Sequence, residues 1–180
     1  MFMSAATLVY SQSPIPEIAL CMDTLFGPPP ATLQLLLDDP AEHDFPCAER
    51  LLSGLTPQQA VTVPPGLSHS IAAILAHMHA NVAFNLGLIG SADPLSFQPP
   101  ENPWPSVSAE EWPHLAQAFL ADLARLGQVG QDAQELARTL YPATADEPGW
   151  TVGYKLAASV AKHNAYHFGQ IALIRQLIGA

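Results

Sequence analysis

Basic residues are scarce in this chain. Six Lys and Arg stand against sixteen Asp and Glu, which gives a formal net charge of −10 at pH 7. Such a charge repels phosphate backbones and anionic lipid surfaces, so we expect neither nucleic acid nor a membrane as a partner. The first basic residue is Arg50, and the N-terminus therefore lacks the charged region of a secretory signal. We expect a cytoplasmic protein.

Three further kinds of signal are absent. The sequence has no run of about 18 consecutive apolar residues, the length that crosses a bilayer. Its two cysteines, Cys21 and Cys47, match no metal-ligand or redox spacing, and we interpret them as free thiols. It also has no G-x-S-x-G, P-loop or G-x-G-x-x-G motif, which leaves nucleophile-elbow hydrolases and nucleotide-binding proteins without support.

Long runs of alternating β-branched residues are missing as well, and the apolar pattern is that of helices. We predict helices at residues 14–26, 31–37, about 46–55, 68–90, 108–140 and 152–178. Most of the 18 prolines fall between these helices rather than inside them. The chain, residues 1–180, is expected to form a single domain, an all-α four-helix bundle whose first helix is broken.

One of these boundaries rests on a local signal. Ser108 followed by Glu111 fits a capping box at the start of the 108–140 helix. Gly127 and Gly130 each disfavour that helix by roughly 1 kcal/mol relative to Ala, yet one long helix is the simplest interpretation of the pattern. The segment 91–107 is rich in proline and long for a loop, and long loops are often functional.

Two histidines interrupt the apolar stripe of the last predicted helix. Steps of three and four lead from Leu156 and Val160 through His163 and His167 to Ile171, so both imidazoles are expected to face other helices. Residues four apart on a helix have Cβ atoms about 5–6 Å apart, which lets two imidazoles converge on one ion. The HxxxH pattern therefore predicts a pair of metal ligands.

A third ligand is expected from the 68–90 helix. His77 shares the inward face of Ile74, whereas His79 is rotated from His77 by about 200°. His69 is about 80° from His77, and we expect it at the mouth of the same cavity, where it contacts a ligand or substrate rather than the metal.

Three neutral imidazoles leave coordination positions open on a divalent ion, which is typical of a catalytic site, and Zn²⁺, Ni²⁺, Fe²⁺ and Mn²⁺ are all compatible. The alternative is a set of core histidines that hydrogen-bond to Tyr166, Asn81 or Gln170. His43 and His114 lie in polar or helix-start contexts and are interpreted as surface residues.

Four segments of the sequence resemble one family. HSIAAILAHMHANVAF (69–84) and KHNAYHFGQIALIRQLIG (162–179) resemble the two signature stretches of the DinB/YfiT-like metalloenzyme superfamily, which is distinct from the translesion polymerase that shares the name DinB. NPWPSV (102–107) and GWTVGYKLAASVAKHN (149–164) resemble that family too. The likeness covers roughly residues 60–180, and the proline-rich first sixty residues depart from it.

The resemblance implies an up-down-down-up four-helix bundle, often a homodimer, with a divalent metal held by one histidine of the second helix and two of the last. The matching positions are His77, His163 and His167. Characterised relatives include transferases that attach bacillithiol or mycothiol to an electrophile and a mycothiol-dependent maleylpyruvate isomerase. In the family the first helix commonly lines both the substrate pocket and the dimer interface. Because the first sixty residues of this chain differ from the family pattern, its pocket and dimer contacts are expected to differ as well.

Two classes of function follow. A metal-dependent enzyme would use the ion to generate a nucleophile, and the absence of Asp or Glu on the His77 and His167 faces favours transfer of a low-molecular-weight thiol over hydrolysis. In that case His69 or Tyr166 would supply the proton step, and the partners would be a thiol and a small-molecule electrophile. The competing class is a non-catalytic, stress-linked metal-binding protein. An open cavity beside the ion, lined by the 91–107 loop, would favour the enzyme.

Overall fold

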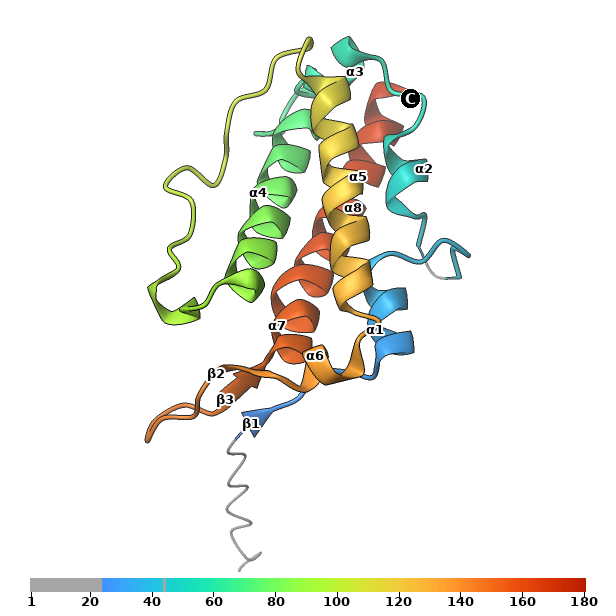
Figure 1. Ribbon diagram of the computed structural model, residues 1–180. Helices are drawn as coiled ribbons and strands as arrows, with labels where there is room; N and C mark the ends of the chain where they lie inside the picture. The colour runs from blue at the N-terminus through green and yellow to red at the C-terminus, as the bar shows by residue number, and fades with distance from the viewer. Residues whose placement is uncertain (1–23, 44) are drawn as a thin grey trace, which may run out of the picture.

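Three long helical rods dominate the computed structural model, which describes residues 24–43 and 45–180 (Figure 1). The first two rods are α4 and α5, and the third is continuous from α7 through a π-helical segment into α8. The helices are α1 (Pro30–Leu37), α2 (Ala48–Leu52), α3 (Pro57–Val61), α4 (Ile71–Gly90), α5 (Trp112–Val129), α6 (Ala133–Ala137), α7 (Val152–Leu156) and α8 (Lys162–Ile178), with a 3₁₀ turn at Pro94–Ser96 and the π-helical segment at Ala157–Ala161.

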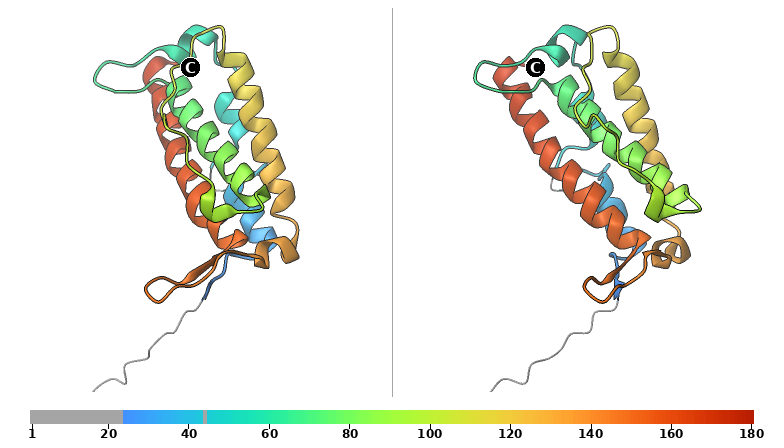
Figure 2. Two further views of the ribbon diagram at one scale, coloured as in Figure 1. Left: turned by 60° about the vertical axis from the view of Figure 1, so that its left-hand side comes forward. Right: turned by 90° about the vertical axis from the view of Figure 1, so that its left-hand side faces the viewer.

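The rods pack side by side, and the short helices α1 and α2 contact α5 and α8 where a fourth rod would lie (Figures 1 and 2). The segment after α4 returns along the whole length of that helix before α5 begins, so α4 and α5 run in the same direction and α8 runs against them (Figure 2). The expected all-α architecture with a broken first helix is therefore present.

A core of aliphatic and aromatic side chains holds the rods together. Its largest completely buried members include Phe119, Leu75, Met78, Leu156 and Ile171. Burial of each such side chain stabilises the fold by about 1.5–3 kcal/mol. By length and composition α4 could span a membrane, but half of its most apolar window is buried inside the bundle, as in the core helix of a globular domain.

Local signals set the ends of the first and last rods. The Ser70 side chain accepts a hydrogen bond from the amide of Ala73 and so caps α4. At the other end of the chain, Gly179 adopts the left-handed conformation (φ 68°) and closes α8. The predicted helices at 68–90 and 152–178 are thereby confirmed to within a few residues, and so are the shorter ones at 31–37 and 46–55.

The prediction of one helix over 108–140 is wrong. Helix α5 ends at Val129, and after a short break the Asp132 side chain accepts hydrogen bonds from the amides of Gln134 and Glu135 to start the separate helix α6. The Gly130 amide closes the end of α5 on the carbonyl of Leu126. Gly130, a weak helix former, and Asp132, a strong N-cap, therefore break the helix here, although the apolar periodicity continues through the break.

Three short strands form a small sheet at one end of the bundle. Strand β3 (Gly149–Thr151) pairs antiparallel with β2 (Thr139–Tyr141) and parallel with β1 (Thr24–Leu25), in the order β1-β3-β2. The predicted helix at 14–26 is wrong where it can be checked, because residues 24 and 25 form β1; its remainder, and Cys21, lie outside the described residues. Cys47 is a half-buried free thiol, as predicted.

Candidate metal centre

Helices α4 and α8 bring together the three histidines that the sequence singled out. His77 lies on α4, and His163 and His167 lie one turn apart on α8. Their ligand nitrogen atoms all lie within 4.8 Å of one another, and the Nε2 atoms of His77 and His163 are 2.9 Å apart. His167 is buried, and the other two are half-buried. The arrangement can hold one metal ion.

Outer hydrogen bonds fix the orientation of two of the rings. The Nδ1–H of His77 donates to the carbonyl oxygen of Pro103 at 2.7 Å, and the Nδ1–H of His167 donates to Oε1 of Gln170 at 2.7 Å. Because both acceptors are oxygens without a proton, the hydrogen of each neutral ring resides on Nδ1, and Nε2 keeps its lone pair. Metal-binding histidines are commonly held in this way.

The third ring completes a neutral, electron-rich cluster. Burial, followed by the like charges of His167 and His77, lowers the pKa of His163 from 6.5 to about 4, and burial also lowers the pKa of His167. The Nε2 lone pair of His77 lies 2.9 Å from Nε2 of His163, a spacing that requires a proton or a cation between them. Neutral imidazoles at this spacing fit a divalent transition-metal ion.

Trp104 lies between two histidines in a stack of three rings. Its indole stacks on His77 at a centroid distance of 4.0 Å and on His69 at 4.1 Å, with interplanar angles of 5° and 9°. His69 is exposed and is separated from His77 by the indole, so it borders the cluster without joining it; its predicted contact with a ligand or substrate stays a prediction. Sequence reasoning assigned no role to Trp104, although an aromatic residue between prolines in a long loop is a usable signal.

Tyr166 is connected to the cluster through Gln170. The phenol oxygen accepts a hydrogen bond of 3.1 Å from Nε2 of Gln170, whose Oε1 accepts from His167, and 65% of Tyr166 is exposed. The alternative interpretation, hydrogen-bonded core histidines, is met only by the bond between His167 and Gln170. That bond uses Nδ1 of His167 and leaves its Nε2 available for a metal ion. Asn81 accepts from Asn85 instead of contacting a histidine.

The other histidines lie elsewhere, as predicted. His79 turns toward α5, where its Nε2 lies 3.0 Å from the Asp122 carboxylate. His43 and His114 are exposed, and His43 bonds to Asp39.

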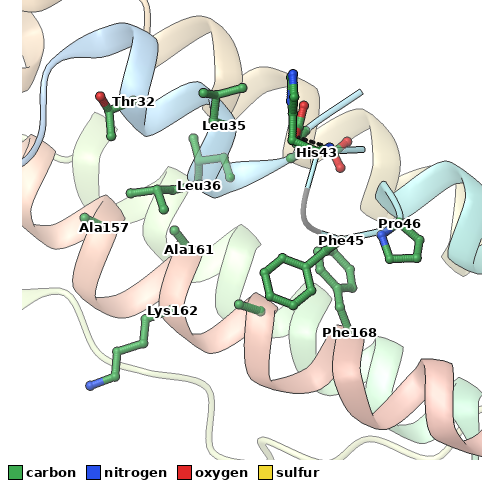
Figure 3. Close-up of a pocket in the computed structure, with 14 residues that line it drawn as sticks. Thr32, Leu35, Leu36, His43, Phe45, Pro46, Ala157, Ala161, Lys162 and Phe168 are labelled. Carbon is green, nitrogen blue, oxygen red and sulfur yellow. Dashed lines mark hydrogen bonds and ion pairs between the residues drawn. The ribbon is translucent and has the colours of Figure 1, made fainter. Parts of the chain in front are cut away.

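Two cavities in the described part of the structure lie away from the three histidines. One of about 560 Å³ lies on a different face of α8, between Leu35 and Leu36 of α1 and Phe45, Ala161 and Phe168 (Figure 3). Another, of about 240 Å³, lies between α1 and α5. Neither is lined by the three clustered histidines, over which the 91–107 segment packs through Pro103 and Trp104.

Comparisons with known proteins give one result. A family model described as the DinB superfamily matches residues 48–171, a range that contains all three clustered histidines. The match begins at α2, so the family likeness extends to residues 48–60, which were expected to depart from it, and it leaves out only the residues before position 48 at this end. No curated protein and no solved structure matches the chain significantly.

Proposed function

The chain belongs to the DinB superfamily, and we propose that it is a divalent-metal enzyme that transfers a low-molecular-weight thiol to a small electrophile. One observation carries the proposal: three neutral imidazoles from two helices converge, and two of them are oriented by outer hydrogen bonds. Zn²⁺, Ni²⁺, Fe²⁺ and Mn²⁺ remain candidates for the ion.

The ion would act as a Lewis acid with open positions, lowering the pKa of a thiol or water that binds there. His77, His163 and His167 would hold it, while Pro103 and Gln170 keep the imidazoles in the metal-binding tautomer. Trp104 covers one face of His77 and keeps water from that side of the cluster.

In a thiol transfer, the sulfur–carbon bond forms as the leaving group departs with its electron pair, and the thiol loses its proton. Two exposed groups border the cluster and can accept or relay that proton: His69, beyond Trp104, and Tyr166, linked through Gln170 to His167. Hydrolysis needs a base in direct contact with the attacking water molecule, whereas both of these groups lie at the border of the cluster, separated from it by Trp104 or Gln170. In the described part of the chain no carboxylate pairs with the three histidines, which favours transfer over the alternative of a metal-dependent hydrolase.

Metal content tests the first half of the proposal. Protein purified without a metal-affinity tag is expected to contain about one divalent ion per chain by plasma mass spectrometry. The ion should be lost in His77→Ala and in His163→Ala, and retained in His79→Ala, because His79 faces Asp122. A wild-type protein that stays metal-free after reconstitution would return the three histidines to the role of hydrogen-bonded core residues.

Turnover tests the second half. Metal-loaded protein should accelerate the loss of free thiol in the presence of alkylating electrophiles, and the His163→Ala variant should not. Consumption of the electrophile without loss of thiol would support the hydrolase alternative. A fully loaded protein without turnover of either kind would support the non-catalytic, stress-linked alternative. Homodimer formation, measured by light scattering, and a cytoplasmic location stay predictions.

A further inference from the structure

The six basic residues differ sharply in their partners. Each arginine contacts carboxylates or carbonyl oxygens: Arg50 with Glu42, Arg125 with Asp122, Arg138 with Glu135, and Arg175 with the carbonyls of Leu51 and Ser53. Neither lysine has a carboxylate at ion-pair distance among the described residues. Lys162 is exposed to water, whereas Lys155 is half-buried. Lys155 is thus a partly desolvated cation without a counter-ion in the described part of the chain.

Aromatic rings surround the Lys155 ammonium. Its nitrogen lies 5.6 Å from the ring centroid of Trp150 and 5.9 Å from those of Phe84 and Tyr141. These distances are near the limit of about 6 Å for cation–π attraction, so the rings compensate only part of the lost hydration. Burial accordingly lowers the pKa of Lys155. An anion bound here would supply the missing opposite charge.

Lys155 and the histidines lie along one seam between α4 and α8. Phe84 follows His77 by seven residues, nearly two full turns, and so lies on the same face of α4 about 10 Å further along. Lys155 precedes His163 by eight residues, and the π-helical segment between them has more residues per turn, which brings the two toward one face. The contact of Lys155 with Phe84 shows that the faces meet.

The same loop covers both positions on the seam. Phe97 packs against Phe84 at a centroid distance of 5.4 Å, and Trp104 stacks on His77. Between the two positions α8 contributes Ala158 and Ser159, whose small side chains are only half-buried. A narrow, extended ligand could therefore contact the histidines at one end and Lys155 at the other.

We propose that Lys155 binds the anionic end of an elongated thiol whose sulfur reaches the three histidines. The ligand class is a low-molecular-weight thiol with a carboxylate about two helical turns from its sulfur. The inference rests on the proposed function, because it takes the thiol as the group at the histidines. A local cation is required, since a chain of net charge −10 otherwise repels anions.

A series of simple thiols of graded length tests the inference. Cobalt-loaded protein is titrated with mercaptopropionate, mercaptohexanoate and mercaptoundecanoate, and with the mercapto-alcohols of matching length. Binding is followed by the sulfur-to-cobalt charge-transfer absorption. A long acid should bind about tenfold more tightly than its matched alcohol, as expected for a hydrogen-bonded charge pair. The shortest acid should show no such preference.

Variants of the only two lysines supply the controls. Lys155→Met should abolish the preference for the acid, Lys155→Arg should retain part of it, and Lys162→Met should leave it intact. Cobalt content and thermal unfolding verify that each variant is folded and loaded. Equal binding of acid and alcohol at every length, or a preference for the acid that survives in Lys155→Met, would overturn the role proposed for Lys155 and leave the proposed function standing. Absence of the absorption with every thiol contradicts the proposed function, and the inference fails with it.

Discussion

At His77 a single loop supplies both contacts that orient the ring. Pro103 accepts the Nδ1 hydrogen through its carbonyl, and the neighbouring Trp104 stacks in parallel on the imidazole. Orientation of a metal ligand by such outer contacts commonly changes metal affinity by about 10–100-fold. The loop at 91–107 therefore belongs to the candidate metal centre, even though none of its residues belongs to the three-histidine cluster.

Trp104→Ala is expected to weaken metal binding about tenfold while leaving the three histidines in place. The reason is that His77 loses its stacking partner and samples other ring orientations. Competition with a chelating dye measures the affinity. The metal affinity of Trp104→Phe should lie between those of wild type and Trp104→Ala. Trp150→Phe, which alters a ring near Lys155 and not one near His77, is the control. Equal affinity of Trp104→Ala and wild type would show that the stack has no part in binding.

At the scale of elements, the approach between the segment after β1 and the start of α7 depends on glycine. A Cβ atom added to Gly27 would overlap the backbone carbonyl of Gly153, which no side-chain rotation can relieve. This contact anchors the sheet and α1 against the third rod. Gly169 is a contrast, because it lies exposed in the interior of α8 with open space where its Cβ would be.

Gly27→Ala should therefore lower the free energy of unfolding by about 2 kcal/mol or more, as overpacking of a tight contact does. Gly169→Ala should raise it by up to about 1 kcal/mol, because alanine restricts the unfolded chain and favours the helix. Urea denaturation followed by circular dichroism measures both. A Gly27→Ala protein as stable as wild type would mean that the first segment is not anchored at this point.

At the scale of the whole molecule, histidines that lose hydration on folding make the stability of the metal-free protein depend on pH. The pKa of His163 is about 4 in the folded protein, against an ordinary value of 6.5. Between these values the unfolded chain binds more protons than the folded one. The contribution is therefore fully present above about pH 6.5 and is lost as the pH falls toward about 4. His167 acts in the same direction.

The midpoint of thermal unfolding of chelator-treated protein should fall between about pH 7 and about pH 5. His163→Gln removes one of the responsible groups and should flatten the dependence, whereas Lys162→Met should not. Differential scanning fluorimetry across the pH range measures this. Parallel curves for wild type and His163→Gln would show that acid destabilises the protein through other groups.

The features that could be predicted from the sequence alone are those set by the local geometry of a helix. The positions of α4 and of the third rod followed from apolar periodicity, and the pairing of His163 with His167 followed from the spacing of four residues on a helix. Both depend on residues close in sequence. The apolar stripe of the third rod was predictable for the same reason, because Leu156, Val160 and Ile171 repeat along one face and are buried.

The tertiary structure alone decided what depends on segments far apart in the chain. It brought His77 to the α8 pair, placed Trp104 between His69 and His77, and surrounded Lys155 with rings from α4 and both strands of the hairpin. It also gave residues 24 and 25 a strand partner more than a hundred positions away. No local propensity encodes these contacts, because each forms only when packing of the whole core brings the distant segments together.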